Sequence, residues 1–496
     1  MQKKSKLAIK AKKVTVVGLA RSGVGAANLL AGLGVDVTIT DIKKKEELKD
    51  FISMLKSSVH IILGEHPEYI FSTADLIVIS PGIQLNISQI LNARSKGIPV
   101  IGELELAYRI LQDLENSSKG KSFIHDKRRA FLAVTGTNGK STTTALLAFI
   151  MTKSKFKTIV GGNIGNALTD EINKRTQMPE NRRNGTFDIS KMSVDYIVTE
   201  VSSFQLESIQ DFRPHIATIL NITPDHLDRY HSIEEYISAK ARICENQNEG
   251  DFLVLNQDDP ITMKIYEKRY RVQKKYPPDV YFFSRKKVVK GVHCKEGTVY
   301  YNFTNNMRSP HSVPIIHTNE IKIKGIHNLE NAMAASAMAL LANCPVDAVR
   351  ESLVEFPGLE HRLEFVKDVK GVKYFNDSKG TNVGAVVKSL ESFEEPIILI
   401  AGGRDKDGDF TPLRPFVKEK VKTLVLIGEA QKKIQNVLGD VTKTVLASDL
   451  REAVGISQSL AVRGDIVLLS PACSSFDMFV DFEDRGKQFK SIVMEL

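Results

Sequence analysis

The stretch FLAVTGTNGKSTTTALLAFI, residues 131–150, decides the fold of this chain. An apolar run leads into a turn that contains glycine, and a helix-forming run follows from Lys140. A strand, a turn and a helix in this order are the context in which a P-loop binds phosphate. There, backbone N–H groups and the helix dipole attract the anion, Lys140 bridges it, and Ser141 can hold Mg²⁺. The stretch therefore predicts a phosphate-binding loop.

The loop is shorter than the common P-loop. The usual pattern has a glycine six residues before the lysine, where this chain has Val134. For that reason the loop argues against an ordinary GTPase or kinase. A chance Gly-Lys-Ser is disfavoured, because the strand, the turn and the helix all agree with the phosphate-loop reading.

Composition places the chain among ordinary globular proteins, with 42% hydrophobic and 26% charged residues. The net charge of +9 comes from scattered lysines without a stacking platform, so acidic substrates such as nucleotides are favoured over nucleic acid. No apolar run is long enough to span a membrane. The four cysteines are far apart and suggest a reduced, cytoplasmic compartment. Cys473 has no histidine nearby in sequence, so a packed thiol is favoured over a nucleophile.

Short β-branched runs alternate with helical stretches along most of the chain. This alternation predicts parallel sheets covered by helices. We expect an α/β fold of three domains: a Rossmann-like domain at 1–102, a central P-loop domain with a parallel mononucleotide-binding sheet at 103–358, and a second Rossmann-like domain at 359–496. Seams are expected in 115–129 and 355–362, and residues 173–193 are expected to form a surface insertion.

The first domain carries a degenerate dinucleotide fingerprint. Gly18, Ala20 and Gly23 form G-x-A-x-x-G after the first strand, and Asp41 ends the next strand. Glycines at these positions let a pyrophosphate approach a helix N-terminus. A tight turn without a ligand explains the motif equally well. A nicotinamide dehydrogenase is a further alternative, but nothing downstream resembles its hydride-transfer partner.

Acidic residues and one histidine follow two strands of the central domain. Glu200 ends one predicted strand, and Asp225, His226 and Asp228 follow another. Ligands of open α/β sheets bind at the carboxyl ends of the strands. Oxygen ligands with one imidazole suit Mg²⁺ that bridges phosphates. We therefore expect a metal site here, with Asp228 as a loop cap.

Nine motifs occur in one order over nearly the whole chain: GTNGKST, GGNIG, EVSSFQLE, LNITPDHLDRY, AKARICEN, KGIHNLENAMAA, EHRLE, NDSKGTN and SPACSSFD. With these motifs the chain resembles the Mur ligase family, which uses the shortened P-loop. The resemblance implies an amide ligase of peptidoglycan precursor synthesis. ATP would phosphorylate the terminal carboxylate of UDP-N-acetylmuramoyl-L-alanine, and the amine of D-glutamate would attack the acyl phosphate.

The resemblance also implies roles for individual residues. Lys140, Glu200, His226 and Lys240 would be catalytic, with Lys240 carbamylated. Without the resemblance, the stretch AKARICEN predicts an ordinary solvated helix residue at Lys240. Two Mg²⁺ ions would be held by Ser141, Glu200, His226 and Lys240. ATP would be bound by Gly136, Thr137, Asn138, Gly139, Lys140, Ser141, Thr142, Asn328, Asn331, Arg362 and Asp377. The UDP substrate would be bound by Arg21, Ser22, Asp41, Ile42, Lys43, Gly82, Asn163 and His226. D-Glutamate would lie among Lys379, Thr381, Lys406, Ser475, Phe476 and Phe482.

The chain departs from the family pattern at three of these positions. Arg21 and Lys43 stand where small or apolar residues are usual, and Phe476 replaces a leucine. Three alternatives share part of the pattern: a folylpolyglutamate synthetase, the ligase that adds the third-position diamino acid, and an idle nucleotide-binding module. The resemblance favours a monomer without a nucleic-acid partner, and domain closure around its substrates.

Overall fold

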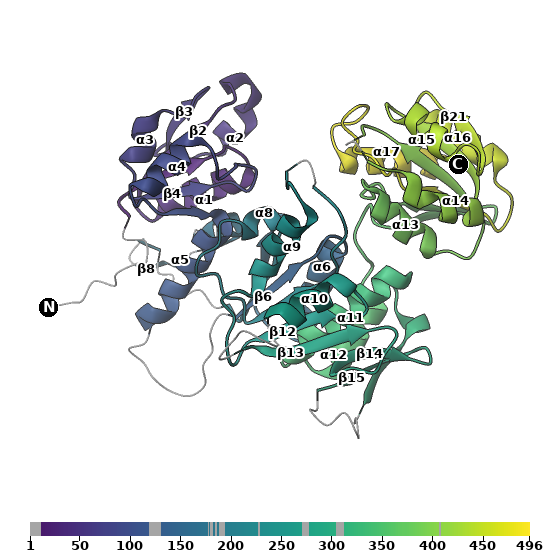
Figure 1. The fold of residues 1–496 in the computed structure, drawn as a ribbon, viewed down its shortest axis with the longest axis horizontal. Coiled ribbons are helices and arrows are strands. Elements are labelled where there is room, and N and C mark those ends of the chain that lie inside the picture. Colours follow the sequence, from purple (N-terminus) through teal and green to yellow (C-terminus); the bar gives the residue numbers. More distant parts are fainter. Residues whose placement is uncertain are drawn as a thin grey trace. The chain divides into compact units, whose positions relative to one another are not determined.

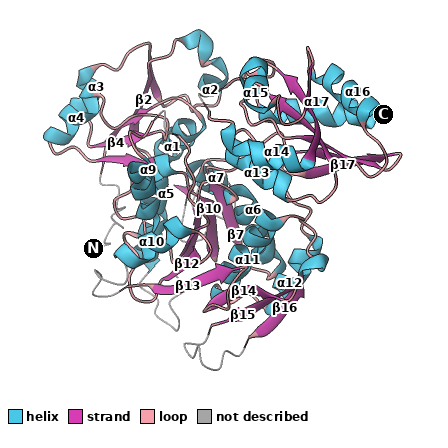
Figure 2. Cartoon of the chain, turned by 45° about the vertical axis from the view of Figure 1, so that its right-hand side comes forward, coloured by secondary structure: helices cyan, strands magenta, loops and turns pink. Residues whose placement is uncertain are grey.

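The computed structural model describes residues 11–118, 130–176, 178, 182–183, 186–187, 194–226, 229–269, 277–303, 312–405 and 408–496. They form three large sheets with helices packed against them (Figures 1 and 2). The expected α/β class with three parallel-sheet regions is confirmed. Lys406, Asp228 and most of the expected insertion at 173–193 lie outside the described residues. Within those residues, no helix has the length and apolar character to cross a membrane.

The first sheet is five-stranded and parallel, in the order β3-β2-β1-β4-β5. The interiors of β1, β2, β4 and β5 are buried, because helices cover both faces of the sheet. The strands are β1 (Lys13–Val17), β2 (Asp36–Asp41), β3 (His60–Leu63), β4 (Leu76–Ile79) and β5 (Val100–Gly102). The helices are α1 (Arg21–Gly32), α2 (Lys49–Ser53), α3 (Glu68–Ser72) and α4 (Ser88–Ser95), and α5 (Glu103–Ser118) follows the last strand.

The second sheet has the order β16-β15-β14-β13-β12-β11-β6-β10-β7. From β7 to β14 its strands pair in parallel, and β14 and β15 form an antiparallel hairpin. The strands are β6 (Ala130–Thr135), β7 (Thr158–Gly162), β10 (Tyr196–Glu200), β11 (Ile216–Ile219), β12 (Phe252–Asn256), β13 (Asp279–Ser284), β14 (Gly291–Lys295), β15 (Thr298–Asn302) and β16 (Val313–His317). A separate pair is formed by β8 (Arg182–Arg183) and β9 (Thr186–Phe187).

Helices α6 (Lys140–Lys153), α7 (Leu168–Thr176), α8 (Ser203–Leu206), α9 (Ile233–Ala241), α10 (Pro260–Arg269), α11 (Ile326–Leu341) and α12 (Val346–Glu355) accompany this sheet in sequence. Every residue of β6 is buried, as its place between β11 and β10 requires. Short 3-10 helices occur at η1 (Lys45–Glu47), η4 (Arg242–Cys244), η5 (Thr318–Glu320) and η6 (Thr411–Leu413).

The third sheet has the order β17-β18-β22-β19-β20-β21, and only β17 is antiparallel to its neighbour. The strands are β17 (Glu364–Val369), β18 (Val372–Asn376), β19 (Ile397–Gly402), β20 (Val421–Ile427), β21 (Lys443–Leu446) and β22 (Ile466–Leu469). The helices are α13 (Val383–Glu391), α14 (Arg414–Lys420), α15 (Gln431–Leu438), α16 (Leu450–Leu460) and α17 (Phe482–Met494).

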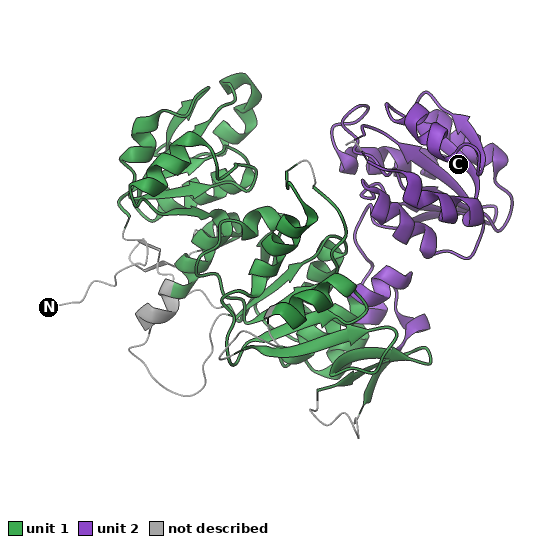
Figure 3. Cartoon of the chain, in the orientation of Figure 1, with its two compact units in different colours: residues 1–316, 332–352 green, residues 317–331, 353–496 purple. Residues whose placement is uncertain are grey.

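The chain divides into two compact units (Figure 3). Residues 1–316 and 332–352 form unit 1, which contains the first sheet and nearly all of the second, and residues 317–331 and 353–496 form unit 2. The expected boundaries at 102 and 358 separate the three sheets in sequence and remain a prediction.

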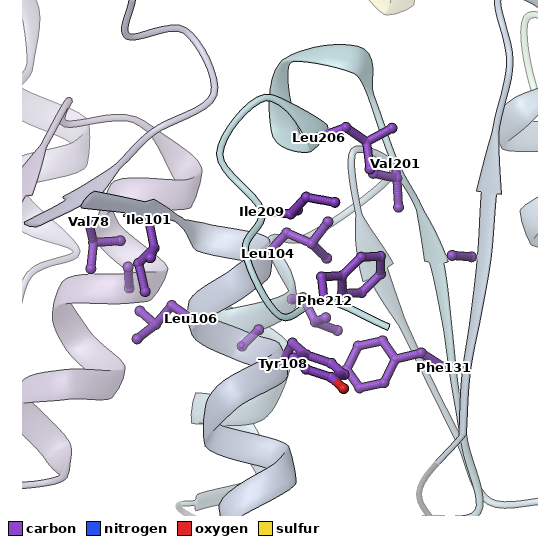
Figure 4. Close-up of a cluster of buried hydrophobic side chains, with 14 of the residues drawn as sticks. Val78, Ile101, Leu104, Leu106, Tyr108, Phe131, Val201, Leu206, Ile209 and Phe212 are labelled. Carbon is purple, nitrogen blue, oxygen red and sulfur yellow. The ribbon is translucent and has the colours of Figure 1, made fainter. Parts of the chain in front are cut away.

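Within unit 1, one hydrophobic core runs from the first sheet to the second through α5 (Figure 4). Leu104 and Tyr108 of α5 lie near Phe131 of β6 and Phe212 of the loop before β11. The rings of Tyr108, Phe131 and Phe212 meet edge to face, with centroids 5.4 to 5.7 Å apart. Such contacts add to the apolar area that the rings bury. This core joins the first sheet to the phosphate-loop strand.

A buried carboxylate fixes the same junction. Glu105 of α5 is fully buried, and its oxygens accept the backbone N–H groups of Gln210, Asp211 and Phe212 at 2.9 to 3.0 Å. Arg109 donates to Glu105 from the next turn of the helix, at 2.8 Å. One side chain therefore satisfies three successive backbone donors of this turn.

Glu105→Ala should destabilise unit 1 strongly. The change would leave three backbone donors without their acceptor, which costs on the order of 3 kcal/mol. Thermal melting followed by circular dichroism measures the effect. Glu249→Ala, which removes an exposed carboxylate, is the matched control and should leave the melting temperature unchanged. Equal melting temperatures for the two variants would contradict this role of Glu105.

Candidate active site

The predicted phosphate loop joins β6 to α6. Gly136 and Gly139 have φ of 151° and 83°, in the region that favours glycine. A Cβ at Gly136 would lie 3.0 Å from Cβ of Leu220, so a side chain there would collide with the neighbouring strand end. Gly139 is the N-cap of α6. The first N–H groups of a helix lack intrahelical acceptors, so this end of α6 suits an anion.

Lys140 is folded back over the loop. Its ammonium donates to the carbonyl oxygen of Gly136 at 3.0 Å and to that of Thr137 at 2.8 Å. A phosphate oxygen is a stronger acceptor for an ammonium than a neutral carbonyl. The side chain is therefore placed to exchange loop carbonyls for a phosphate.

Glu200 ends β10, next to β6 in the sheet, and is 2% exposed. Its Oε1 accepts Nδ2 of Asn163 at 2.6 Å. Its Oε2 is buried, and no hydrogen-bond partner occurs for it among the described residues. A buried carboxylate oxygen without a donor is costly. A hard cation such as Mg²⁺ would supply the missing interaction, so this side chain fits the predicted metal role.

Lys240, in the last turn of α9, is 2% exposed. Its ammonium nitrogen donates to the carbonyl oxygen of Gly136 at 2.8 Å and lies 4.6 Å from the ring centre of Tyr236. Burial, and next the charge of Lys140, hold the pKa of Lys240 well below its usual range, against the opposing effect of Asp225 and Glu200. Sequence alone suggested a solvated helix residue, and the structure shows a buried amine.

His226 lies in the loop after β11, with φ of 55°. Its ring packs edge-on against Phe204, with centroids 4.9 Å apart, and its Nε2 is 3.8 Å from Oδ2 of Asp225. Asp225 also accepts the backbone N–H of His226 at 3.0 Å. Within the described part of the chain, no three His, Cys, Asp or Glu side chains gather as a ready metal site. A Mg²⁺ site here would need other ligands, such as Ser141, a carbamate or phosphate oxygens.

Six of the predicted UDP residues lie at the first sheet, whereas Asn163 and His226 follow strands of the second. Asp41 accepts the backbone N–H of Leu19 at 2.7 Å and that of Lys43 at 2.9 Å, so its carboxylate shapes the loop. Ile42 is 66% exposed, and Arg21, Ser22 and Lys43 are exposed or half-buried. The carbonyl oxygen of Gly82 accepts a hydrogen bond from Nη1 of Arg229 at 3.4 Å. This contact joins the loop after β4 to the loop after β11.

The other predicted ATP residues belong to unit 2. Asn331 donates from Nδ2 to Oδ1 of Asn328 at 3.3 Å, and both side chains are buried. Asp377 is buried and accepts the hydroxyls of Ser389 and Ser470, each at 2.7 Å. Burial raises the pKa of Asp377 to about 6, although the two hydroxyls oppose it. Arg362 is half-buried.

Two of the predicted D-glutamate residues of unit 2 meet at the first turn of α17. The Lys379 ammonium nitrogen lies 3.6 Å from the ring centre of Phe482. Thr381 donates its backbone N–H to the carbonyl oxygen of Lys379 at 2.8 Å. Ser475 is buried, whereas Phe476 is 61% exposed. The structure thus brings Lys379 and Phe482 together.

Three residues that contact these loops were not singled out from the sequence: Asn221, Tyr236 of α9 and Arg485 of α17. Tyr236 meets the hydroxyl of Thr137 at 3.2 Å. Arg485 of α17 is fully buried and binds the carbonyl oxygens of Ser378 and Cys473 at 2.8 and 3.3 Å. Asn221 lies two residues after the end of a strand, a signal that could have identified it. Nothing in the helical pattern of α17 marks Arg485 as buried.

Three family descriptions match consecutive parts of the chain. Residues 12–102 match the Mur ligase MurD-like N-terminal domain, residues 134–339 match the Mur ligase middle domain, and residues 361–473 match the Mur ligase glutamate ligase domain.

Curated relatives match the chain over its length. The chain is 44% identical over 490 residues to the UDP-N-acetylmuramoylalanine–D-glutamate ligase of Geotalea daltonii, covering 98% of both chains. It is 40% identical over 493 residues to the enzyme of that name from Clostridioides difficile, covering 98% of this chain and 99% of the relative.

Solved structures show the same fold at low identity. MurF from Acinetobacter baumannii has a TM-score of 0.60 at 15% identity, covering 97% of this chain and 93% of that one. The UDP-N-acetylmuramate–alanine ligase MurC from Thermotoga maritima has a TM-score of 0.55 at 20% identity, covering 97% and 99%.

Cys473 should resist alkylation in the folded protein. Burial raises the pKa of its thiol to about 12, so the reactive thiolate is scarce at neutral pH. Iodoacetamide treatment followed by peptide mass spectrometry measures the modification, with protein unfolded in denaturant as the control. Rapid labelling of Cys473 in the folded chain would revive the nucleophile that sequence analysis disfavoured.

Proposed function

This chain belongs to the Mur ligase family, and from that premise we propose that it adds D-glutamate to UDP-N-acetylmuramoyl-L-alanine in an ATP-dependent step of peptidoglycan precursor synthesis. The choice of reaction rests on the relatives of that name, which match over their full length. The observation in this chain that carries the phosphoryl step is the buried Glu200, with one unpartnered oxygen, beside the phosphate loop. We place the enzyme in the cytoplasm as a monomer.

The chemistry follows from the poor leaving group of a carboxylate. A carboxylate oxygen of the muramoyl-alanine takes the γ-phosphoryl group of ATP, and ADP leaves. The amine of D-glutamate then attacks the acyl carbon to form a tetrahedral intermediate. The amide forms as the amine loses a proton and phosphate departs with the former carboxylate oxygen. Phosphoryl transfer depends mainly on positioning and on stabilising charge.

Lys140 and the first turn of α6 would carry the phosphoryl step. Lys140 already lies over the loop, and its charge gains value as negative charge shifts between the transferring oxygens. Gly136, Thr137, Asn138, Gly139, Ser141 and Thr142 would shape and line the cradle, while Asn328, Asn331, Arg362 and Asp377 would bind the rest of the nucleotide.

Mur ligases use ATP and Mg²⁺. When bound, Mg²⁺ would neutralise phosphate charge in the transition state. We propose two ions, one held by Ser141 and Glu200, and the other by His226 and a carbamylated Lys240. The unpartnered Oε2 of Glu200 supports the first assignment. The buried amine of Lys240 supports the second, because carbon dioxide adds to a neutral amine and the lowered pKa favours that form.

The substrate ends would be bound by loops of both units. We assign the UDP-muramoyl substrate to Arg21, Ser22, Asp41, Ile42, Lys43, Gly82, Asn163 and His226. We assign D-glutamate to Lys379, Thr381, Lys406, Ser475, Phe476 and Phe482. Support comes from the position of these loops after parallel strands, where α/β sheets bind ligands.

Phosphate release tests the function. The chain is incubated with ATP, UDP-N-acetylmuramoyl-L-alanine and a panel of amino acids that includes L-glutamate and a diamino acid. Release only with D-glutamate supports the proposal. Phosphate release with a diamino acid, or with a folate in place of the UDP substrate, would favour one of the related ligases instead. NAD binding without phosphate release would favour the dehydrogenase alternative.

Lys140→Ala should lower turnover by about a hundredfold or more, because the charge it removes acts chiefly in the transition state. Phosphate release measures the rate, and circular dichroism checks the fold. Lys153→Ala, at the exposed end of the same helix, should retain wild-type turnover. A Lys140→Ala variant with near wild-type turnover would disprove the P-loop assignment.

Lys240→Ala should also lower turnover strongly with a native fold, and acetate should restore part of it by placing a carboxylate where the carbamate stood. Lys264→Ala removes an exposed helical lysine and serves as the control. Full activity of Lys240→Ala would remove this residue from the mechanism, and loss without rescue would argue against the carbamate.

A further inference from the structure

The shortened phosphate loop is held from outside by the neighbouring strand end. Asn221, two residues after the end of β11, uses its side-chain amide to bind both backbone groups of Asn138. Oδ1 accepts the N–H of Asn138 at 2.9 Å, and Nδ2 donates to its carbonyl oxygen at 3.1 Å. The carbonyl oxygen of Asn221 also accepts the N–H of Thr137 at 2.9 Å. Two successive loop residues are therefore bound to one asparagine.

The segment that carries Asn221 is itself braced. Asn256, which is buried, donates to the carbonyl oxygen of Leu220 at 3.0 Å. Thr223 donates its N–H to the Thr137 hydroxyl at 3.0 Å, and that hydroxyl donates in turn to the carbonyl oxygen of Thr223 at 3.1 Å. Leu220 continues the ladder by donating to the carbonyl oxygen of Thr135 at 3.0 Å. The two hydrogen bonds from the Asn221 side chain to Asn138 form a clamp on the loop, and these contacts hold the segment that carries the clamp in place.

The clamp determines which amides face an anion. The N–H groups of Thr137 and Asn138 donate to Asn221, so the protein itself engages these two donors. The first-turn amides of a helix have no acceptor four residues back, so the N-terminus of α6 suits an anion. A longer P-loop has a further glycine where this chain has Val134. In this loop, hydrogen bonds from the next strand do the shaping.

We propose that Asn221 is a positioning residue that fixes the phosphate loop in its nucleotide-binding conformation before ATP arrives. The side chain binds only the loop backbone in the contacts described, so it acts through the loop and not on the substrate. The proposal rests on the ATP-dependent function above. An unbraced loop would have to be ordered by ATP, and that ordering lowers the apparent affinity for ATP.

Asn221→Ala should raise the KM for ATP by roughly tenfold or more, as expected for two hydrogen bonds of ordinary net strength. The KM values for UDP-N-acetylmuramoyl-L-alanine and D-glutamate should stay near wild type. Asn221→Asp, nearly the same in shape, keeps the acceptor but loses the donor to Asn138. It should also raise the KM for ATP, and it tests the proposal if the alanine variant fails to fold.

The matched control is Asn246→Ala. Asn246 also grips backbone from its side chain, donating to the carbonyl oxygens of Gln210 and Phe212 at 2.8 and 3.1 Å, but it lies outside the phosphate loop. It should lower the melting temperature and leave the KM for ATP unchanged. Adding ATP with Mg²⁺ should raise the melting temperature of this control as in the wild type, and should raise that of Asn221→Ala much less.

The outcomes separate the two proposals. Wild-type chain without ATP-dependent phosphate release overturns the function itself. Active wild type, with an Asn221 variant whose KM for ATP is unchanged, overturns the positioning role. Equal losses toward all three substrates in both Asn221 variants overturn it as well, because they would mean that the residue supports the fold in general.

Discussion

The carbonyl oxygen of Gly136 is the point on which this site depends, because the ammonium groups of Lys140 and Lys240 both bind it. Two cations on one neutral acceptor repel each other, and burial makes the repulsion stronger. The two lysines differ in how far they are buried, and this difference reduces the repulsion. Lys240 is the fully buried one, and its lowered pKa favours the neutral amine, whereas Lys140 is half-buried. A carbamate on Lys240 would turn the repulsion into attraction.

The strand order explains how distant sequence segments reach this carbonyl. β11, β6, β10 and β7 are consecutive parallel neighbours, so their carboxyl ends lie at one edge of the sheet. Asn221 follows β11, the phosphate loop follows β6, Glu200 ends β10, and Asn163 follows β7. Asn163 binds Glu200 through its side chain at 2.6 Å and through its backbone N–H at 2.9 Å. The site is thus a row of neighbouring strand ends.

The sequence predicted what depends on local pattern. Apolar β-branched runs marked the strands, and glycine with lysine marked the phosphate loop at Gly139 and Lys140. The sequence did not show which single polar residues within helices are buried. Lys240 reads as an ordinary surface lysine because α9 carries two glutamates in its first turn, and only tertiary packing makes it buried. Arg485 was missed for the same reason. Local propensity cannot show which helix face meets a loop from another strand.

Unit 2 also buries charged side chains, and their direct hydrogen-bond partners are neutral. Arg485 is buried against carbonyl oxygens and the Ser378 hydroxyl, and Asp377 is buried against two serine hydroxyls. Burial lowers the pKa of Arg485 to about 10 and raises that of Asp377 to about 6. Each ion is therefore held by dipoles at a cost in desolvation. Charged neighbours add to these contacts: Asp477 and Asp377 raise the pKa of Arg485, and Arg362 lowers that of Asp377. Burial still dominates both shifts, so the surrounding dipoles and charges offset only part of the cost of desolvating these two side chains.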